Sequence, residues 1–443
     1  MTLSVIVDLL NKQKLVEGVV LRTQQTPRHD LVETVVHKQH LAELKALLER
    51  MAPRDIAAVL EQVGGDDART LWALLDEQHA NDVLWELSPA LGETLAGPRE
   101  PQFRAGQVNV YELADGRIKV RDVTCRADME NITPIWIDLL GASEAERNWI
   151  GRKYGLDLPD PDDLTDLEAS ARFHVDEGGE VHLHSNFLLD RDDSPGNVPV
   201  AFILHRDILF TLRNEDLPVF RLQRLRTRNQ PGSVVDCWDL LLELYGADVE
   251  YSADALESTY DTLRKVGQDV LSENVSDSDA ARLLSDIAAE EDLNGRIRNN
   301  MMDTRRALSF LIRGRFLDAE QAQDAREILR DIESLASHTA FLFDKINFLL
   351  DATVGFINVN QNKRVSQLTV AGVVFMPLNV LAGIGGMSEF SMMTQGVPWP
   401  LSYGAFILGM GLVGWATYLA VRWFERRKRT DGLLKNRPKL RAV

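Results

Sequence analysis

The stretch Val365–Ser388, VSQLTVAGVVFMPLNVLAGIGGMS, contains 24 residues and no charged side chain. A second uncharged stretch follows Glu389, and its part Leu401–Val421 is almost wholly apolar or small. A helix needs about 20 residues to cross about 30 Å of hydrocarbon. Both stretches are long enough, so the sequence predicts two membrane-spanning helices. Two buried core helices are the alternative, which we disfavour because adjacent uncharged stretches at a chain end are unusual in a domain that folds in water.

The predicted spans occupy 365–388 and 401–423, and the loop 389–400 joins them. Lys363 and Arg364 precede the first span, and nine Lys and Arg residues lie between Arg422 and Arg441. The loop carries neither Lys nor Arg. Positively charged flanks stay on the cytoplasmic side of a membrane. We therefore expect a multi-pass protein of the cell (inner) membrane with both termini, including the basic tail 424–443, in the cytoplasm.

The composition limits the classes of function. The chain has 443 residues, a net charge of −18 and two cysteines, Cys125 and Cys237. Its length predicts several domains, and two cysteines form neither a disulfide framework nor a zinc motif. The excess of acids argues against a nucleic-acid partner. Because no nucleotide-binding loop or catalytic arrangement stands out, we expect neither an enzyme nor a catalytic cofactor.

The first span carries polar and small residues at helical spacing. The following residues are three or four positions apart and so share one helical face: Val365, Leu368, Gly372, Met376, Asn379, Gly383 and Gly386. A ring of such helices would place Asn379 amide oxygens around a path for a hydrated cation such as Mg²⁺, which gives up its water reluctantly. Met376 and Leu368 would form apolar constrictions. Alternatively, Asn379 hydrogen-bonds between packed helices.

Short motifs in this span resemble a known family. Leu368-Thr369, Phe375–Asn379 and Ala382–Ser388 resemble the first membrane helix of the CorA family of divalent-metal transporters, which ends in a Gly-Met-Asn motif. Here the entrance motif is Gly386, Met387 and Ser388, followed by Glu389, whose charge would attract cations or is simply solvated. The resemblance extends upstream to Trp136–Leu139, which resembles the start of the family's cytoplasmic α/β domain, and to Val198–Arg213, VPVAFILHRDILFTLR, which resembles the later strands of that domain.

This resemblance implies an α+β membrane protein that assembles as a homopentameric funnel in the lipid bilayer. A cytoplasmic α/β domain would occupy 98–250, and long helices that include a stalk would occupy 251–364. By the same resemblance Asp351 lies in an acidic ring near the cytoplasmic pore mouth. An exposed acid on the stalk is the alternative interpretation of Asp351.

The N-terminal part, 1–97, shows a weak repeat of about 24 residues. Asp55–Val63 parallels His79–Leu87, and each predicts a short amphipathic helix that ends at Gly64-Gly65 or Ser88-Pro89. This helical-repeat pattern is similar to the N-terminal domain of the MgtE magnesium channel family, in which acids help to sense Mg²⁺. The acids here are Asp55, Asp66, Asp67, Asp76 and Asp82. Solvated helix faces and caps are their alternative role, so the metal-sensing residues stay open.

Two further polar groups stand out. His182 and His184 alternate in a predicted strand and share one side of it. We expect exposed strand residues there, rather than a metal site that His174 and Asp176 could complete. Eight acids in the helical stretch predict a solvated helix face or, alternatively, carboxylates that divalent ions bridge between subunits: Glu273, Asp277, Asp279, Asp286, Glu290, Glu291, Asp292 and Asp303.

Taken together, these features predict a divalent metal cation channel or transporter. Mg²⁺ is the favoured transported and regulatory ion, and Co²⁺ or Ni²⁺ are further candidates. A zinc transporter of the same fold, with or without proton coupling, is one alternative, because Ser388 departs from the family motif. A membrane-anchored regulatory or interaction protein without a pore is the other.

Overall fold

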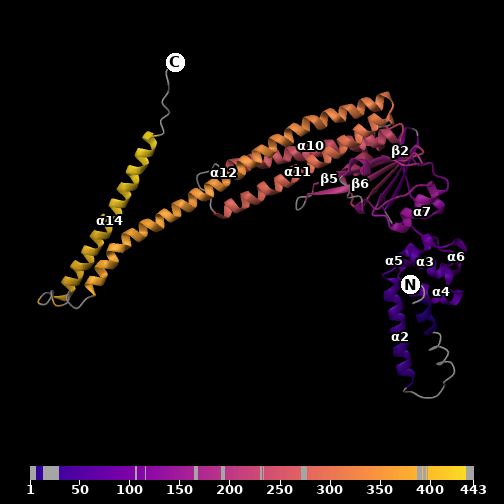
Figure 1. Cartoon of the computed structure of the whole chain (residues 1–443), viewed down its shortest axis with the longest axis horizontal. Helices are drawn as coiled ribbons and strands as arrows, with labels where there is room; N and C mark the ends of the chain where they lie inside the picture. Colours follow the sequence, from indigo (N-terminus) through magenta and orange to yellow (C-terminus); the bar gives the residue numbers. More distant parts are fainter. Residues whose placement is uncertain are drawn as a thin grey trace. The chain divides into compact units, whose positions relative to one another are not determined.

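The computed structural model describes most of the chain, in two compact units. It describes residues 6–12, 29–104, 107–114, 116–163, 168–190, 195–229, 232, 234–270, 277–386, 392, 396 and 398–435. One unit, which we call the sheet unit, is Met1–Thr262 with Ala289–Asp344. The other, which we call the span unit, is Leu263–Ala288 with Lys345–Val443. Each is described by itself below (Figure 1).

Short helices open the sheet unit. They are α2 (His29–Leu48), α3 (Pro53–Gln62), α4 (Gly65–Trp72), α5 (Glu77–Glu86) and α6 (Pro89–Ala96). Helices α3 and α5 end just before Gly64-Gly65 and Ser88-Pro89, as the sequence predicts. Proline at the first turn of α3 and α6 costs no helical hydrogen bond, because that N–H has no partner in the helix. Ile56, Leu60, Leu71 and Val83 form part of their common core. The assignment of 1–97 as a separate repeat domain stays a prediction.

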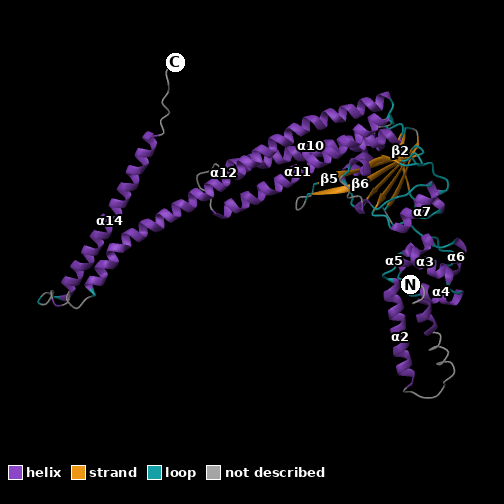
Figure 2. Ribbon diagram, in the orientation of Figure 1, coloured by secondary structure: helices purple, strands orange, loops and turns teal. Residues whose placement is uncertain are grey.

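A seven-stranded sheet follows, in the order β2-β1-β3-β7-β6-β5-β4 (Figure 2). The strands are β1 (Val108–Ala114), β2 (Arg117–Arg121), β3 (Trp136–Leu140), β4 (Phe173–Val175), β5 (Val181–Leu189), β6 (Gly196–His205) and β7 (Ile208–Arg213). Strands β3 and β7 are parallel, and the other described pairs are antiparallel. Arg206 and Asp207 have positive φ angles of 49° and 62°, which suits a two-residue hairpin loop between twisted strands. The expected strands within Val198–Arg213 are therefore confirmed.

Helices cover both faces of the sheet. Helix α7 (Glu144–Tyr154) buries Ile150 against the face that carries Ile137, Ile203 and Phe210. It begins with a capping box between Ser143 and Glu146, which satisfies two N–H groups that a helix start leaves unpaired. The short elements of the sheet unit are 3-10 turns at Ala127–Met129 and Pro161–Asp163, and α8 (Ala169–Arg172).

Aromatic packing closes the opposite face. Helix α9 (Pro218–Asn229) contributes Phe220, and α10 (Cys237–Val270) contributes Tyr245. Both rings lie within 6.5 Å, centroid to centroid, of Phe202 on β6. Aromatic pairs at this separation add packing energy beyond the area that they bury. The sheet is thus the middle of three layers.

A fully buried ion pair lies under this aromatic layer. Arg213 and Asp138 have side chains that are 0% exposed, with Nη2 and Oδ2 2.8 Å apart. Asp138 also accepts a hydrogen bond from the Thr211 hydroxyl at 2.8 Å, and the Arg213 guanidinium lies 4.3 Å from the centre of the Phe220 ring. A buried ion pair is tolerated only where its remaining hydrogen bonds are also satisfied. This network therefore fixes β3 against β7.

Long helices complete both units. They are α10, α11 (Asp277–Gly314), α12 (Ala319–Gly385) and α14 (Trp399–Lys435). The expected stalk and first span form one unbroken helix, α12, of 67 residues, which is about 100 Å at 1.5 Å per residue (Figure 1). Among the described residues, two helical segments are long and apolar enough to cross a membrane, within Ala319–Ile384 and Trp399–Trp423.

Candidate functional site

Helices α12 and α14 pack along one face each. On α14 the less exposed positions recur every three or four residues: Ser402, Phe406, Met410, Gly414, Thr417 and Val421. Gly414 is the buried member, and a Cβ placed on it would lie 3.3 Å from Cδ1 of Leu378. The absence of a side chain at Gly414 therefore lets the two helices approach closely, as small residues do in membrane helix pairs.

On α12 the half-buried positions within the predicted span define the face that meets α14. They are Val370, Val374, Pro377, Leu378 and Leu381. The six residues that the sequence assigns to the cation path and its entrance within the described range are all exposed: Leu368, Gly372, Met376, Asn379, Gly383 and Gly386. At about 100° per residue, these two sets centre on opposite sides of the helix. The face predicted to line a path is thus the face that α14 leaves uncovered.

The entrance motif is described only in part. Gly386 is exposed at the end of α12. Met387, Ser388 and Glu389 lie outside the described residues. Their assignment as an entrance therefore stays a prediction.

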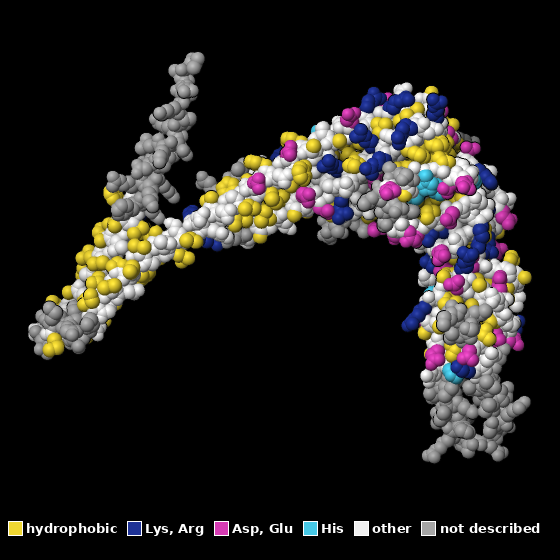
Figure 3. Space-filling view, viewed as in Figure 1, with side chains coloured by type: hydrophobic (Ala, Val, Ile, Leu, Met, Phe, Trp, Pro, Cys, Tyr) yellow, Lys and Arg dark blue, Asp and Glu magenta, His cyan; other side chains and the backbone are white. Residues whose placement is uncertain are grey.

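The part of α12 that precedes the predicted span exposes an unusual number of apolar side chains. Phe348, Val359 and Phe341 are 64%, 61% and 57% exposed. Figure 3 shows hydrophobic side chains gathered along this helix. Asp351 lies among them and is exposed, which both interpretations of this acid require. Apolar side chains in water destabilise a protein, so a further surface is expected to cover them.

Structural contacts involve several of the acids that the sequence suggests for metal sensing. The Asp76 side chain caps α5 by accepting the backbone N–H of His79 at 2.8 Å, and this hydrogen bond holds the pKa of Asp76 below its usual value. Asp82 is buried and pairs with Arg104 at 2.7 Å, while burial raises the pKa of Asp82. Asp55 and Asp66 are exposed. A sensing role for these acids stays a prediction.

The expectation that His182 and His184 are exposed is wrong. They are 5% and 7% exposed. The reason is that β5 lies between β4 and β6, and both of its faces are covered. The signal was present in the sequence, because Leu183 and Phe187 stand on one side of the strand while Leu188 stands on the other. A strand that is apolar on both faces is buried on both.

Asp303 also departs from the expected solvated helix face. It is 4% exposed and accepts two hydrogen bonds from the guanidinium of Arg172, at 2.8 and 2.6 Å. Asn186 donates to the same carboxylate at 3.1 Å. The Asp303 carboxylate therefore already has three hydrogen-bond donors within the same chain.

Known proteins resemble most of this chain in sequence. The family model described as CorA-like Mg2+ transporter protein matches residues 132–428. The chain is 41% identical over 322 residues to the magnesium transport protein CorA of Yersinia pseudotuberculosis serotype I (strain IP32953), which covers 72% of this chain and 99% of that relative. It is 39% identical over 321 residues to the magnesium transport protein CorA of Escherichia coli (strain K12), with the same coverage of both chains.

A solved structure supports the fold. The full-length CmaX protein matches with a TM-score of 0.51 at 14% sequence identity, covering 73% of this chain and 99% of that one. The family match spans the sheet from β3 onward, the three long helices α10–α12 and both predicted spans. On this match and on the identity to its curated relatives, the chain belongs to the CorA-like Mg²⁺ transporter family.

Proposed function

We propose that the protein conducts hydrated Mg²⁺ across the cell (inner) membrane through a path lined by the α12 helices of a homopentamer. The observation that carries this proposal is the position of Leu368, Met376 and Asn379 on the face of α12 opposite α14. Family membership supports the transport of a divalent cation, and the relatives named above are magnesium transport proteins. That naming favours Mg²⁺ over the zinc alternative.

Several copies are needed because one chain encloses nothing. Helix α14 packs on a single face of α12, and none of the most apolar stretch of α12 is buried within the described chain. Gly372 and Gly383 have no heavy atom within 4 Å of an added Cβ, so a neighbouring helix can approach there. The exposed aromatic residues of the stalk would be covered by the same neighbours. Five copies is the number that we propose.

The chemistry of the path suits an ion that keeps its water. Between Arg364 and Glu389 the span has no charged side chain, so no carboxylate competes for direct coordination. A ring of Asn379 amide oxygens would accept hydrogen bonds from the waters bound to Mg²⁺, which that ion gives up reluctantly. Met376 and Leu368 would narrow the path with apolar groups, which close a pore by expelling water.

The ends of the path and its regulation complete the proposal. Glu389 at the outer entrance and Asp351 at the cytoplasmic mouth would concentrate cations by their charge. The basic residues after the second span keep both termini in the cytoplasm. Mg²⁺ would also act as a regulatory ion by binding exposed acids of α11, such as Glu291, in the closed state.

A flux measurement tests this function. We would reconstitute the purified protein in liposomes that contain a Mg²⁺-sensitive dye and compare wild type with Asn379→Leu. The matched control is Val373→Leu, an exposed apolar position to the side of the proposed path. We expect Asn379→Leu to lose at least about tenfold of the Mg²⁺ flux, because the polar ring disappears, and Val373→Leu to keep it.

The outcome separates the alternatives. Unchanged Mg²⁺ flux in Asn379→Leu would show that Asn379 does not line the path. Liposomes that stay impermeable to every divalent ion even with wild type would favour the membrane-anchored regulatory protein. Saturation of the flux by Zn²⁺ at concentrations well below those of Mg²⁺ would favour the zinc transporter.

A further inference from the structure

Three histidines and an aspartate meet at one edge of the sheet. Strand β4 is the edge strand, and His174 on β4 lies directly opposite His182 on β5. Opposed residues of an antiparallel pair point to the same side of a sheet. The rings of His174 and His182 are stacked, with centroids 4.9 Å apart and planes 6° apart, and His184 stands edge-on to both.

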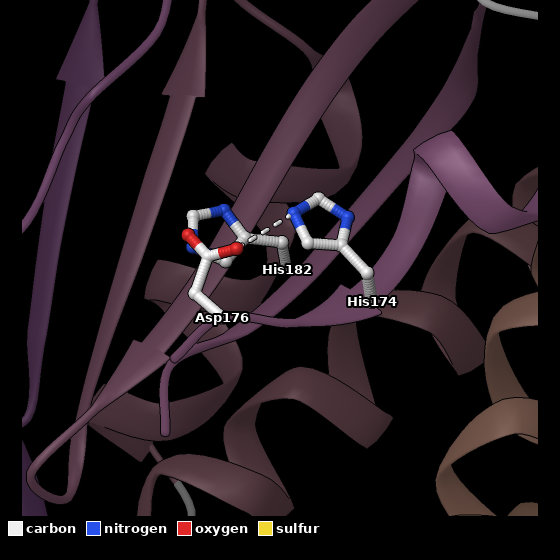
Figure 4. A group of neighbouring side chains, drawn as sticks. All are labelled: His174, Asp176 and His182. Carbon is white, nitrogen blue, oxygen red and sulfur yellow. Dashed lines mark ion pairs between the residues drawn. The ribbon is translucent and has the colours of Figure 1, made fainter. Parts of the chain in front are cut away.

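Asp176 completes the group from the turn after β4. Its backbone is fixed by two hydrogen bonds, because its N–H donates to the carbonyl of Glu180 at 3.0 Å and its carbonyl accepts from Gly179 at 2.9 Å. Figure 4 shows its carboxylate beside the two imidazole rings of His174 and His182. The turn therefore places an acid against a cross-strand pair of histidines.

The separations match those of ligands on one metal ion. His174 Nε2 lies 3.3 Å from Asp176 Oδ1, and His182 Nε2 lies 3.2 Å from Asp176 Oδ2. One potential ligand atom from each of the three residues lies within 4.8 Å of the others. Two ligands bound to one tetrahedral ion at 2.0–2.1 Å are about 3.3 Å apart. The three ligand atoms are therefore close enough for one ion to bind all of them once the two imidazole rings tilt.

The buried histidine has an unused nitrogen. The His182 side chain is 7% exposed, and its Nε2 makes no hydrogen bond among the described residues, although Asp176 lies 3.2 Å away. A buried polar atom usually has a partner. Here the nitrogen faces a carboxylate and a second imidazole, which is the environment of a metal ligand.

An ion can reach this place from solvent. The side chains of Asp176 and His174 are 47% and 34% exposed. Asp176 also lines a groove of 490 Å³ together with Glu180 and Asp157. The groove therefore leaves the Asp176 carboxylate open to an ion and to the water that would complete its coordination.

We propose that His174, Asp176 and His182 form a binding site for a transition-metal ion of the Zn²⁺, Co²⁺ or Ni²⁺ class. Two imidazoles and one carboxylate suit these ions, whereas Mg²⁺ prefers oxygen ligands alone. The site lies entirely within the sheet unit and does not depend on the proposed Mg²⁺ path. Because an ion lies in the plane of an imidazole that binds it, binding tilts the two parallel rings toward each other. His174 can move most readily, since it belongs to the edge strand.

Metal binding to the purified full chain in detergent tests the site. After removal of metals with a chelator, Zn²⁺ is titrated against a chromophoric zinc indicator, and Co²⁺ is added to record its visible absorption. We expect one tight Zn²⁺ per chain, at least about tenfold weaker in His174→Gln and in Asp176→Asn. His338→Gln, which removes an exposed imidazole elsewhere in the sheet unit, should bind as wild type does.

The controls separate a loss of metal binding from a loss of folding. Both variants alter partly exposed side chains, and Asp176→Asn preserves the shape of the side chain, so their folding can be verified by circular dichroism. A Zn²⁺-dependent rise in melting temperature should occur in wild type and His338→Gln and be absent in the two site variants. Equal affinity in all four proteins, or displacement of Zn²⁺ by a hundredfold excess of Mg²⁺, would overturn the proposal. Flux is not part of the readout, so failure here leaves the transport proposal standing.

Discussion

The sheet unit and the span unit differ in where their side chains find packing and hydrogen-bond partners. In the sheet unit, the buried ion pair finds its partners in the same chain, since Asp138 accepts hydrogen bonds from Arg213 and Thr211. In the span unit, Asn379 is exposed, and only 6% of the most apolar stretch of α14 is buried. This buried network of the sheet unit is therefore satisfied within one chain. The span unit depends on lipid and on other copies of the chain.

The largest expected effect breaks the internal network of the sheet unit. Arg213→Met leaves the carboxylate of Asp138 buried without its cation, which should cost about 3–5 kcal/mol of unfolding free energy. Urea unfolding of the purified chain, followed by tryptophan fluorescence, measures this loss. The matched control is Arg226→Met, whose partner Glu250 is exposed and whose loss should cost less than about 1 kcal/mol. Equal losses in the two variants would contradict the contrast between buried and exposed pairs.

The second effect concerns pH and Asp248. This side chain is buried on α10, where it accepts the N–H of Leu188, and burial raises its pKa to about 7. An unfolded aspartate titrates near 3.9. Between these two pKa values, Asp248 holds more protons in the folded protein than in the unfolded protein. The free energy of unfolding therefore falls as pH rises and then stays level above about pH 7.

Asp248→Asn removes this titration. From pH 4 to pH 8, the free energy of unfolding of wild type should fall by roughly 3–4 kcal/mol relative to that of the variant, because each unit of pKa shift corresponds to about 1.4 kcal/mol. Urea unfolding of both proteins across this range measures the difference, in which the titration of other groups cancels. A difference that is independent of pH would show that Asp248 is not buried as described.

The smallest effect sharpens the description of the span unit. Gly414→Leu places a side chain where Leu378 packs, and forcing these helices apart should cost about 1–3 kcal/mol. We also expect reduced Mg²⁺ flux, because α12 moves. At Gly409 on the same helix, an added Cβ would have no heavy atom within 4 Å. Gly409→Leu should therefore change neither the stability nor the flux. Thermal unfolding in detergent and liposome flux measure both variants, and a harmless Gly414→Leu would argue against this helix contact.

Features set by local sequence could be predicted. The uncharged stretches require an apolar environment wherever the chain folds, so both spans follow from composition. The ends of α3 and α5 also follow from the stop signals in the neighbouring residues. The motifs around Met376 and Asn379 pointed to the family that the comparisons show.

Burial and pairing were decided by contacts between distant residues. Arg172 and Asp303 are 131 positions apart, and Arg213 and Asp138 are 75 apart. The sequence indicated exposed strand residues at His182 and His184, but β5 is an inner strand that is buried on both faces. Which face of α12 meets α14 depends likewise on where Gly414 and Leu378 touch. Sequence periodicity and charge predict whether a segment forms a helix or a strand and whether it requires an apolar environment, because these properties are local. Only the tertiary structure supplies the partner, because a contact requires two segments to meet.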